Sequence, residues 1–276
     1  MADEEFVLRH RPVYLLPLFA LCMPLRAQQP EDVPPTVKRG EAAAVEVSAG
    51  AEFQRFEVSA TENVDKFSVP LTARLTTGPL RISAQLPYVR ITGPGNVVAP
   101  SGPLGLPILI DPTKPAEVST REGVGDLRVG VAYDLPVPGL NVSLSSGAKL
   151  PTASAEKGLG TGETDYWLGT EFSTTLGAVT PFAGIAYTKA GDPDGFELRN
   201  TLSGQAGAAL RLGSSTSAHL GYSYAEGASQ SAQDEQRLFG GMNTAVGNGL
   251  SLGLYGSAGV NGPADVGAGV RLGIGL

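Results

Sequence analysis

A histidine close to serines can form the core of a hydrolytic site, and one such group occurs in this chain. His219 has Ser217 and Ser223 two and four positions away. A membrane-embedded lipid hydrolase would pair a serine nucleophile with a nearby histidine base. Alternation along this segment, however, places His219 on the polar face, and no acidic residue stands within two positions of it. We therefore interpret His219 as a polar interior residue and predict no catalytic residue.

Acidic and glycine-rich stretches are the other candidates for binding chemistry. The stretch Gly191–Gly195, with Glu197 after it, offers acidic side chains. It lacks the later acidic ligand of a calcium loop, so we interpret it as a surface turn. The stretch Gly158–Gly162 has neither the glycine spacing nor the strand–helix context of a nucleotide site. The sequence therefore predicts no metal site and no cofactor.

Charged and amide side chains recur on the polar face of the alternating segments. With Glu46 and Glu52 they would form ladders of ion pairs inside a narrow tube. Two interpretations stay open: the ladders hold a filled interior together, or they line a slender pore and select which solutes pass. The predicted lumen residues are Arg74, Arg81, Gln85, Arg128, Lys149, Asp165, Glu171, Arg199 and Arg211.

An apolar run lies in the longest connection, between Thr92 and Glu122, where the alternating pattern has no place for it. Connections longer than about 12–15 residues are usually functional or disordered. We predict that this run plugs the mouth or collects apolar solute; the alternative is that it folds onto the rim or adds a short extra hairpin. The predicted constriction residues are Leu104, Leu106, Ile108 and Ile110.

These side chains must be positioned by β-strands, because the dominant pattern after residue 40 is alternation with period 2. Most of the runs approach the roughly 9–11 residues of a tilted strand that crosses a bilayer, whereas globular strands peak near about 5–6 residues. The runs number about twelve and cover residues 45–53, 67–75, 80–88, 127–135, 140–150, 166–176, 179–187, 198–212, 218–224, 238–246, 250–254 and 266–276.

Composition and connections favour a membrane barrel. After residue 25, no stretch reaches the roughly 18 consecutive apolar residues of a transmembrane helix. Charged residues are only 17% of the chain, and its net charge of −7 argues against a nucleic-acid partner. The connections alternate between tight turns and longer polar loops, which is the rule for outer-membrane barrels.

Aromatic residues near the run ends are expected to form an interfacial girdle. In hydrocarbon each unpaired backbone amide costs several kcal/mol, so the first and last strands must pair, and the final run, 266–276, is predicted to close the barrel. The fold class is therefore all-β: a closed antiparallel transmembrane β-barrel of about twelve strands. The predicted girdle residues are Tyr88, Tyr133, Tyr166, Trp167, Tyr187, Tyr222 and Tyr224.

The N-terminal residues predict export. Arg9 and Arg11 precede an apolar run, residues 13–25, and Ala27 offers a cleavage site, so residues 1–27 are predicted to be a signal peptide. The only cysteine, Cys22, lies within it. Residues 28–40 are proline-rich and are predicted to be a flexible segment. The barrel is predicted over residues 41–276.

Four short motifs occur around the fourth, fifth and sixth runs. They are Gly125-Asp126-Leu127, Leu150-Pro151-Thr152, Gly160-Thr161-Gly162 and Asp165. In these motifs the chain resembles a bacterial family of outer-membrane transporters of the meta-pathway of phenol degradation. The resemblance is clearest over residues 120–170, and it implies uptake of small hydrophobic or aromatic compounds. Leu276 departs from the terminal phenylalanine that is typical of such barrels.

We therefore expect a passive channel in the bacterial outer membrane for small solutes, with hydrophobic or aromatic compounds as the expected class. Its expected partners are outer-membrane lipid, the barrel assembly machinery and a small-molecule solute, with no nucleic acid and no cofactor. The first alternative is a structural or adhesive barrel with a packed lumen. The second is a membrane-embedded lipid hydrolase that uses His219.

Overall fold

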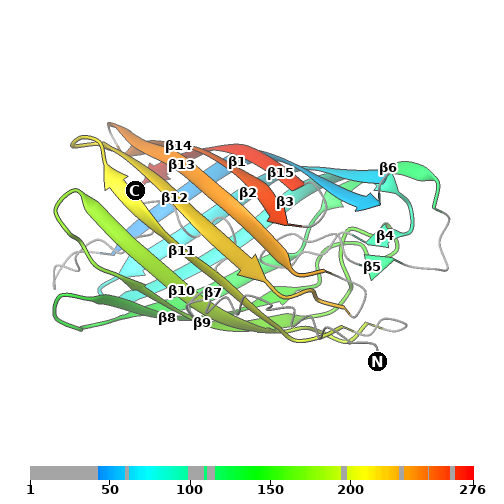
Figure 1. Ribbon diagram of the computed structural model, residues 1–276, viewed down its shortest axis with the longest axis horizontal. Helices are drawn as coiled ribbons and strands as arrows, with labels where there is room; N and C mark the ends of the chain where they lie inside the picture. The colour runs from blue at the N-terminus through cyan, green and yellow to red at the C-terminus, as the bar shows by residue number, and fades with distance from the viewer. Residues whose placement is uncertain are drawn as a thin grey trace, which may run out of the picture.

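The computed structural model describes residues 43–59, 62–98, 109–110, 116–193, 198–229, 233–247, 249–261 and 265–276. Their secondary structure consists of strands (Figure 1). Within these ranges no helix has the length and apolarity needed to cross a membrane. The predicted signal peptide and flexible segment lie outside the described residues and stay predictions.

Each strand is antiparallel to the strands it pairs with. The bounds are β1 (Ala44–Ser59), β2 (Glu62–Thr77), β3 (Leu80–Pro94), β4 (Val97–Val98), β5 (Leu109–Ile110), β6 (Val118–Val124), β7 (Leu127–Leu135), β8 (Asn141–Leu150), β9 (Asp165–Ser173), β10 (Val179–Lys189), β11 (Thr201–Arg211), β12 (Thr216–Ala225), β13 (Glu235–Gly247), β14 (Leu250–Asn261) and β15 (Asp265–Gly275).

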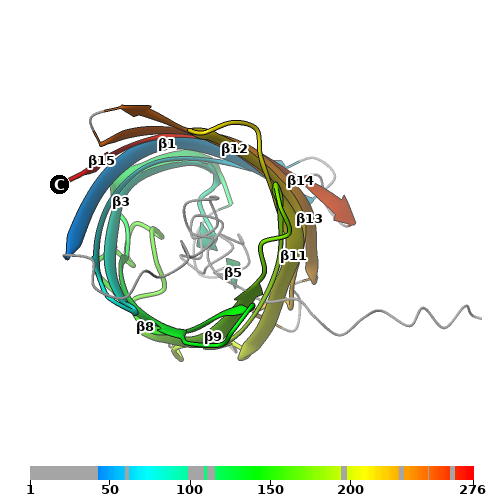
Figure 2. The ribbon, with the colours of Figure 1, turned by 90° about the vertical axis from the view of Figure 1, so that its left-hand side faces the viewer.

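The main sheet closes into a ring, because β1 pairs with β2 on one side and with β15 on the other (Figure 2). The sheet contains thirteen strands, of which β6 and β7 follow one another along β3 and share one position, so the ring has twelve positions. The closing ladder runs from Glu46 opposite Gly275 to Phe56 opposite Asp265. Even the last residue takes part, since Leu276 N donates to Val45 O at 2.8 Å. The predicted closed barrel is confirmed.

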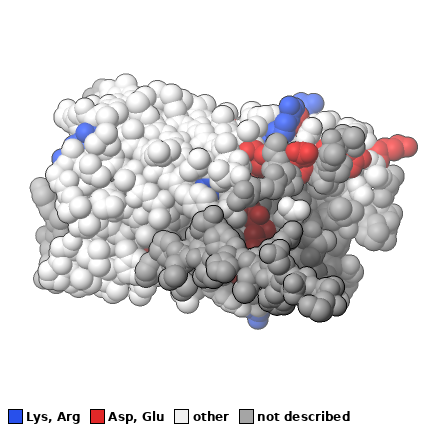
Figure 3. All heavy atoms as spheres, in the orientation of Figure 1, with Lys and Arg blue, Asp and Glu red and all other residues white. Residues whose placement is uncertain are grey.

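The outer face of the barrel is apolar. The side chains that the sequence assigns to one face of each run point outwards; Leu71, Leu168 and Leu220 are 55%, 64% and 67% exposed. In water so large an exposed apolar surface would drive association, whereas in a bilayer it matches the solvent. Figure 3 shows a wall almost free of charge, with most of the visible charged atoms at the end where β6 lies.

The two ends of the barrel differ. At one end, which we call the turn end, β2–β3, β7–β8, β9–β10, β11–β12 and β13–β14 are joined by short connections. Gly78 and Gly139 in these turns have φ values of 54° and 75°, a backbone conformation that favours glycine. The other end, the loop end, carries the longer connections. The predicted alternation of short and long connections is confirmed, apart from the short β1–β2 and β14–β15 connections at the loop end.

The predicted long loop between Thr92 and Glu122 is shorter than expected. β3 continues to Pro94 and β6 begins at Val118, and the two pair along Tyr88–Pro94. Thr92 and Glu122 therefore belong to the wall. The outward positions beyond Tyr88, Arg90 and Thr92, are polar, so the apolar alternation ends before the strand itself does.

Beyond the apolar band, β1, β2, β3 and β6 continue with reversed polarity. On the outer face Arg55 binds Asp65 (Nε–Oδ1 2.6 Å), which lowers the pKa of Asp65, and Arg90 pairs with Glu122 at 3.7 Å. A wall that stands in water places charges outside and apolar side chains inside, so the reversal marks where the barrel leaves the lipid. The inner apolar core at this level consists of Phe56, Val64, Val89, Ile91, Val97, Ala153 and Leu159.

We predict that Leu71→Arg lowers the free energy of unfolding in lipid vesicles by about 2–4 kcal/mol, because an arginine would face hydrocarbon midway along β2. Denaturant titration in vesicles measures this loss. The control is Thr72→Arg, on the inner face, which should cost at most about 1 kcal/mol for its lost hydrogen bond with Gln85. A larger loss in the control would contradict the assignment of the two faces.

Candidate functional site

The interior of the barrel is the candidate site. Paired residues in an antiparallel ladder share a face, and the Tyr255 hydroxyl bonds the carboxylate of Glu52 across the β14–β15–β1 ladders, which identifies the inner face. On this register all the predicted lumen residues except Arg199 are at inner-face positions: Arg74, Arg81, Gln85, Arg128, Lys149, Asp165, Glu171 and Arg211. That they line an open pore stays a prediction.

Cross-strand polar contacts line the half of the barrel near the turn end. Arg81 Nη2 binds Asp134 at 2.9 Å and donates to Ser143 Oγ at 2.7 Å, which connects β3, β7 and β8. Arg74 pairs with Glu46 at 3.5 Å. These contacts join neighbouring wall strands, so the charges lie along the wall as the predicted ladders would.

Arg199 is not a lumen residue, and that prediction is wrong. It precedes β11, which begins only at Thr201, and its Nη2 donates to the carbonyls of Gly227 at 3.0 Å and Ser229 at 2.8 Å. It therefore joins two loop-end connections. The apolar alternation continues through Leu198, which forms an isolated bridge with Ser229, so alternation alone does not show where β11 begins.

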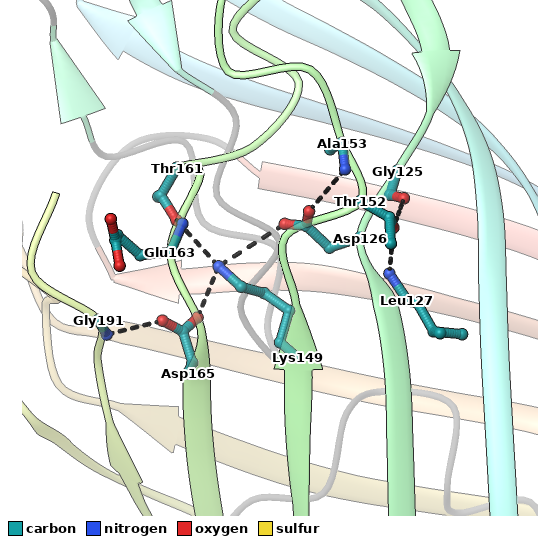
Figure 4. A network of polar contacts seen from close by, with 10 residues as sticks. All are labelled: Gly125, Asp126, Leu127, Lys149, Thr152, Ala153, Thr161, Glu163, Asp165 and Gly191. Carbon is teal, nitrogen blue, oxygen red and sulfur yellow. Dashed lines mark hydrogen bonds and ion pairs between the residues drawn. The ribbon is translucent and has the colours of Figure 1, made fainter.

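A buried network around Lys149 brings the four sequence motifs together at the loop end (Figure 4). The Lys149 ammonium lies 2.9 Å from Asp165 Oδ2 and 3.6 Å from Asp126 Oδ2, and it donates to Thr161 Oγ1 at 3.0 Å. The side chains of Lys149 and Asp126 are 4% and 0% exposed. Asp126 also accepts from Ala153 N at 3.0 Å. The sequence predicted Lys149 and Asp165 here but missed Asp126 as a site residue.

A bulge directs Asp126 inwards. β3 pairs with β7 up to Gln85 opposite Arg128 and with β6 from Tyr88 opposite Val124, which leaves one extra residue between the two registers. Gly125 donates its N–H to Pro87 O at 2.8 Å, and a Cβ there would lie 2.8 Å from the Pro87 ring. Thus both Gly125 and Asp126 turn away from the lipid. The Gly-Asp-Leu motif was the available signal, but its register shift depends on β3.

Thr152 holds the bulge from the neighbouring strand. Its Oγ1 donates to Gly125 O at 2.8 Å and accepts from Leu127 N at 2.8 Å. It therefore provides hydrogen-bond partners for one carbonyl and one N–H that the irregular ladder does not pair. The Leu-Pro-Thr motif therefore has a structural role beside the Gly-Asp-Leu motif. The two motifs and Lys149 form one unit.

A second buried network lies beyond the apolar band, near the junction of β13, β15 and β1. Arg237, 1% exposed, contacts the carboxylates of Glu235 and Asp265, and its guanidinium lies 5.6 Å from the ring centroid of Phe56. Burial disfavours the charged carboxylate and raises the pKa of Asp265 to about 7. This network joins the closing strand to its neighbours.

Aromatic side chains on the inner face were missed. Each lies against a glycine of a neighbouring strand: Phe182 against Gly207, Phe239 against Gly221, and Tyr255 against Gly269. The signal was present, because these residues alternate with the outward apolar positions on their strands. They were passed over because the inner face was assumed to be polar.

Trp167 is not part of the outer girdle, so that prediction is wrong. It alternates with outward Tyr166 and Leu168, and its ring covers Gly147 and approaches Gly130 on the inner face. The side chains of Tyr88, Tyr133, Tyr166 and Tyr187 are 44–57% exposed. They share the outer register with Tyr222 and Tyr224, whose hydroxyls donate to Gln236 and Asp234, both at 2.7 Å. The girdle role of these tyrosines stays a prediction.

Of the predicted constriction residues, Leu104, Leu106 and Ile108 lie outside the described residues. Ile110 belongs to β5, which pairs with β4 through Val97 and stands within the outline of the ring in Figure 2. Arg121 holds β4 in place by donating to Val97 O at 2.8 Å and Gly95 O at 3.1 Å. This hairpin matches the alternative of an extra hairpin in the connection; its effect on passage stays a prediction.

Known outer-membrane barrels have the same fold. A family model described as “Putative MetA-pathway of phenol degradation” matches residues 42–265, and no curated protein matches the chain in sequence. The chain is similar to the COG4313 outer membrane channel from Pseudomonas putida F1, with TM-score 0.68 and 16% identity over 88% of this chain and 99% of that one. The chain is also similar to the translocator domain of the autotransporter NalP from Neisseria meningitidis, with TM-score 0.51 and 16% identity over 86% of this chain and 89% of that one.

We predict that Lys149→Met lowers the free energy of unfolding by about 3–5 kcal/mol at neutral pH, because Asp126 and Asp165 then stay buried without their cation. The matched control is Arg90→Met, which breaks an exposed ion pair with Glu122 and should cost about 0–1 kcal/mol. Urea titration in detergent micelles compares the two. Equal losses would show that the Lys149 network is not energetically distinct from a surface pair.

Proposed function

The chain belongs to the family described as “Putative MetA-pathway of phenol degradation”, and on this basis we propose that it is a passive outer-membrane channel for small hydrophobic or aromatic solutes. The description of a similar structure as an outer membrane channel supports the proposal. The loop end faces the outside of the cell and the turn end faces the periplasm, because outer-membrane barrels have short periplasmic turns and longer extracellular loops.

The observation that carries the proposal is the orientation of the large inner side chains. Phe182, Phe239, Tyr255 and Trp167 lie along the wall, each against a glycine, so they do not point across the tube. A barrel that is stabilised by a packed interior needs inward side chains that meet at its axis. Rings that lie flat against glycines leave the axis to solute. This favours the channel over a structural barrel with a packed lumen.

Selectivity follows from two kinds of inner surface. The rings offer apolar contact for a hydrophobic or aromatic solute. The charges are paired along the wall, as in Arg81–Asp134 at 2.9 Å, so they guide polar groups without presenting a strong field of one sign. The β4–β5 hairpin at the loop end adds a constriction. In this proposal solute moves down its gradient without a catalytic step, and lipid and the barrel assembly machinery are the remaining partners.

We predict that the purified chain forms discrete conducting channels in planar bilayers and that Ser83→Trp lowers their single-channel conductance several-fold. Ser83 lies on the inner face of β3 opposite Gly130, so a large ring there would narrow the tube. The matched control is Ala84→Trp, one residue further along and on the outer face, which should leave the conductance unchanged.

Absence of conductance steps from correctly folded protein would support the packed barrel instead. Heat-modifiable migration on gels verifies folding in each sample. An equal effect of the two tryptophans would mean that the current does not pass through the barrel.

A further inference from the structure

Three rings form a continuous surface on the inner wall over β10–β13. The ring centroids of Phe182 and Phe239 are 6.4 Å apart, and His219 lies 6.2 Å from Phe239. Phe182 and His219 are half-buried, so part of each ring faces the interior. Centroid separations of this size are those of interacting aromatic pairs.

Glycines allow this surface to be flat. Gly207 and Gly221 face each other in the β11–β12 ladder, between Phe182 on β10 and Phe239 on β13. A Cβ on Gly207 would lie 2.7 Å from Phe182 Cζ, and one on Gly241 would lie 2.7 Å from His219 Cε1. Any larger residue at these positions would push a ring off the wall.

Two amide groups flank the rings. Gln205 stands one inner-face position from Gly207 towards the loop end, and Asn243 stands one position from Gly241 towards the turn end. They are 5% and 4% exposed. Neither Gln205 Nε2 nor Asn243 Nδ2 has a hydrogen-bond partner within the described part of the chain. Buried amide donors are normally paired, so these two nitrogens are donors that an acceptor on a solute could bind.

We propose that this wall holds a binding site for a planar aromatic ring that carries a hydrogen-bond acceptor. The solute ring lies on half-buried Phe182, which buried Phe239 supports from the side, while its oxygen accepts from Gln205 Nε2. Consecutive inner-face positions on one strand are about 7 Å apart. The distance from the centre of a solute ring, through its substituent oxygen, to the nitrogen that donates to this oxygen is of the same size. His219 with Asn243 repeats the pairing one step nearer the turn end, so a solute can move between two weak sites, as conduction requires.

The inference rests on the proposed channel and deepens it by naming the class of solute. The inner wall over β10–β13 differs from the inner wall around Trp167 on β9. There the ring covers Gly147, and the neighbouring buried polar groups are hydroxyls such as that of Thr188. The amide atoms of the β10–β13 wall that lack a partner within the described residues, Gln205 Nε2 and Asn243 Nδ2, are nitrogens that can only donate, whereas a hydroxyl can donate or accept, so this wall is the more selective for acceptors.

The site is tested by how strongly three neutral probes interrupt the ion current: benzamide, cyclohexanecarboxamide and toluene. Cyclohexanecarboxamide has the same acceptor as benzamide but no aromatic face. Toluene has an aromatic ring but no acceptor. Benzamide should interrupt the wild-type current at a several-fold lower concentration than either of the others. Phe182→Leu should abolish the preference for benzamide over cyclohexanecarboxamide, and Gln205→Leu should abolish its preference over toluene.

The matched control is Phe172→Leu on the outer register of β9, which should retain both preferences. Equal sensitivity of the wild type to the three probes, or unchanged preferences in both inner variants, would overturn the site while the conductance without solute still supports the channel. If the wild type does not conduct, the channel proposal fails, and equilibrium binding of benzamide and cyclohexanecarboxamide to the detergent-solubilised barrel decides the site alone. Preference for benzamide that is lost in Phe182→Leu would support the site, and no preference would overturn it.

Discussion

The ladder between β1 and β15 is the constraint on which the rest of the structure depends. A backbone amide without a partner costs several kcal/mol in hydrocarbon, so a sheet can cross a bilayer only without free edges. Here the pairing runs from Glu46–Gly275 to Phe56–Asp265, and Leu276 N still donates to Val45 O. Since the ring is closed, each strand has one face towards lipid and one towards the interior. The inside of this protein is defined by that closure.

Where the strands extend beyond the lipid, alternation continues but the polarity of the two faces is reversed. Beyond the band the outer face carries Arg55–Asp65 and Arg90–Glu122, while Phe56 and its neighbours form a core inside. The two buried networks lie towards this end, where the ladder is irregular or begins. The Lys149 network fixes the bulge at Asp126, and the Arg237 network joins the closing strand to β13. Charged side chains therefore hold the rim in shape at this end, and the inner wall over β10–β13 carries glycine and aromatic residues.

On the central wall, large inner residues lie against glycines of neighbouring strands. Glycine weakens an isolated strand because it has no side chain to pack, but here Gly207 and Gly221 are covered by Phe182 and Phe239 from neighbouring strands. The ring of the neighbouring strand packs on the glycine backbone and so replaces the side-chain contacts that glycine lacks. The same contacts stabilise the wall and form the surface proposed to bind solute. Stability and selectivity thus draw on the same residues.

Period-2 alternation by itself determined the twelve wall positions, the outward face of each strand and the closing role of residues 266–276, because a face towards lipid allows only one register of apolar residues. Contacts between strands decided the rest. The register shift between β6 and β7 along β3 turns Asp126 towards Lys149, and the ring of Trp167 lies over Gly147 of β8. Arg199 bonds a connection almost thirty residues away. Alternation records which side of a strand a residue occupies, but its partner is set by the neighbouring strand, and that information lies elsewhere in the chain.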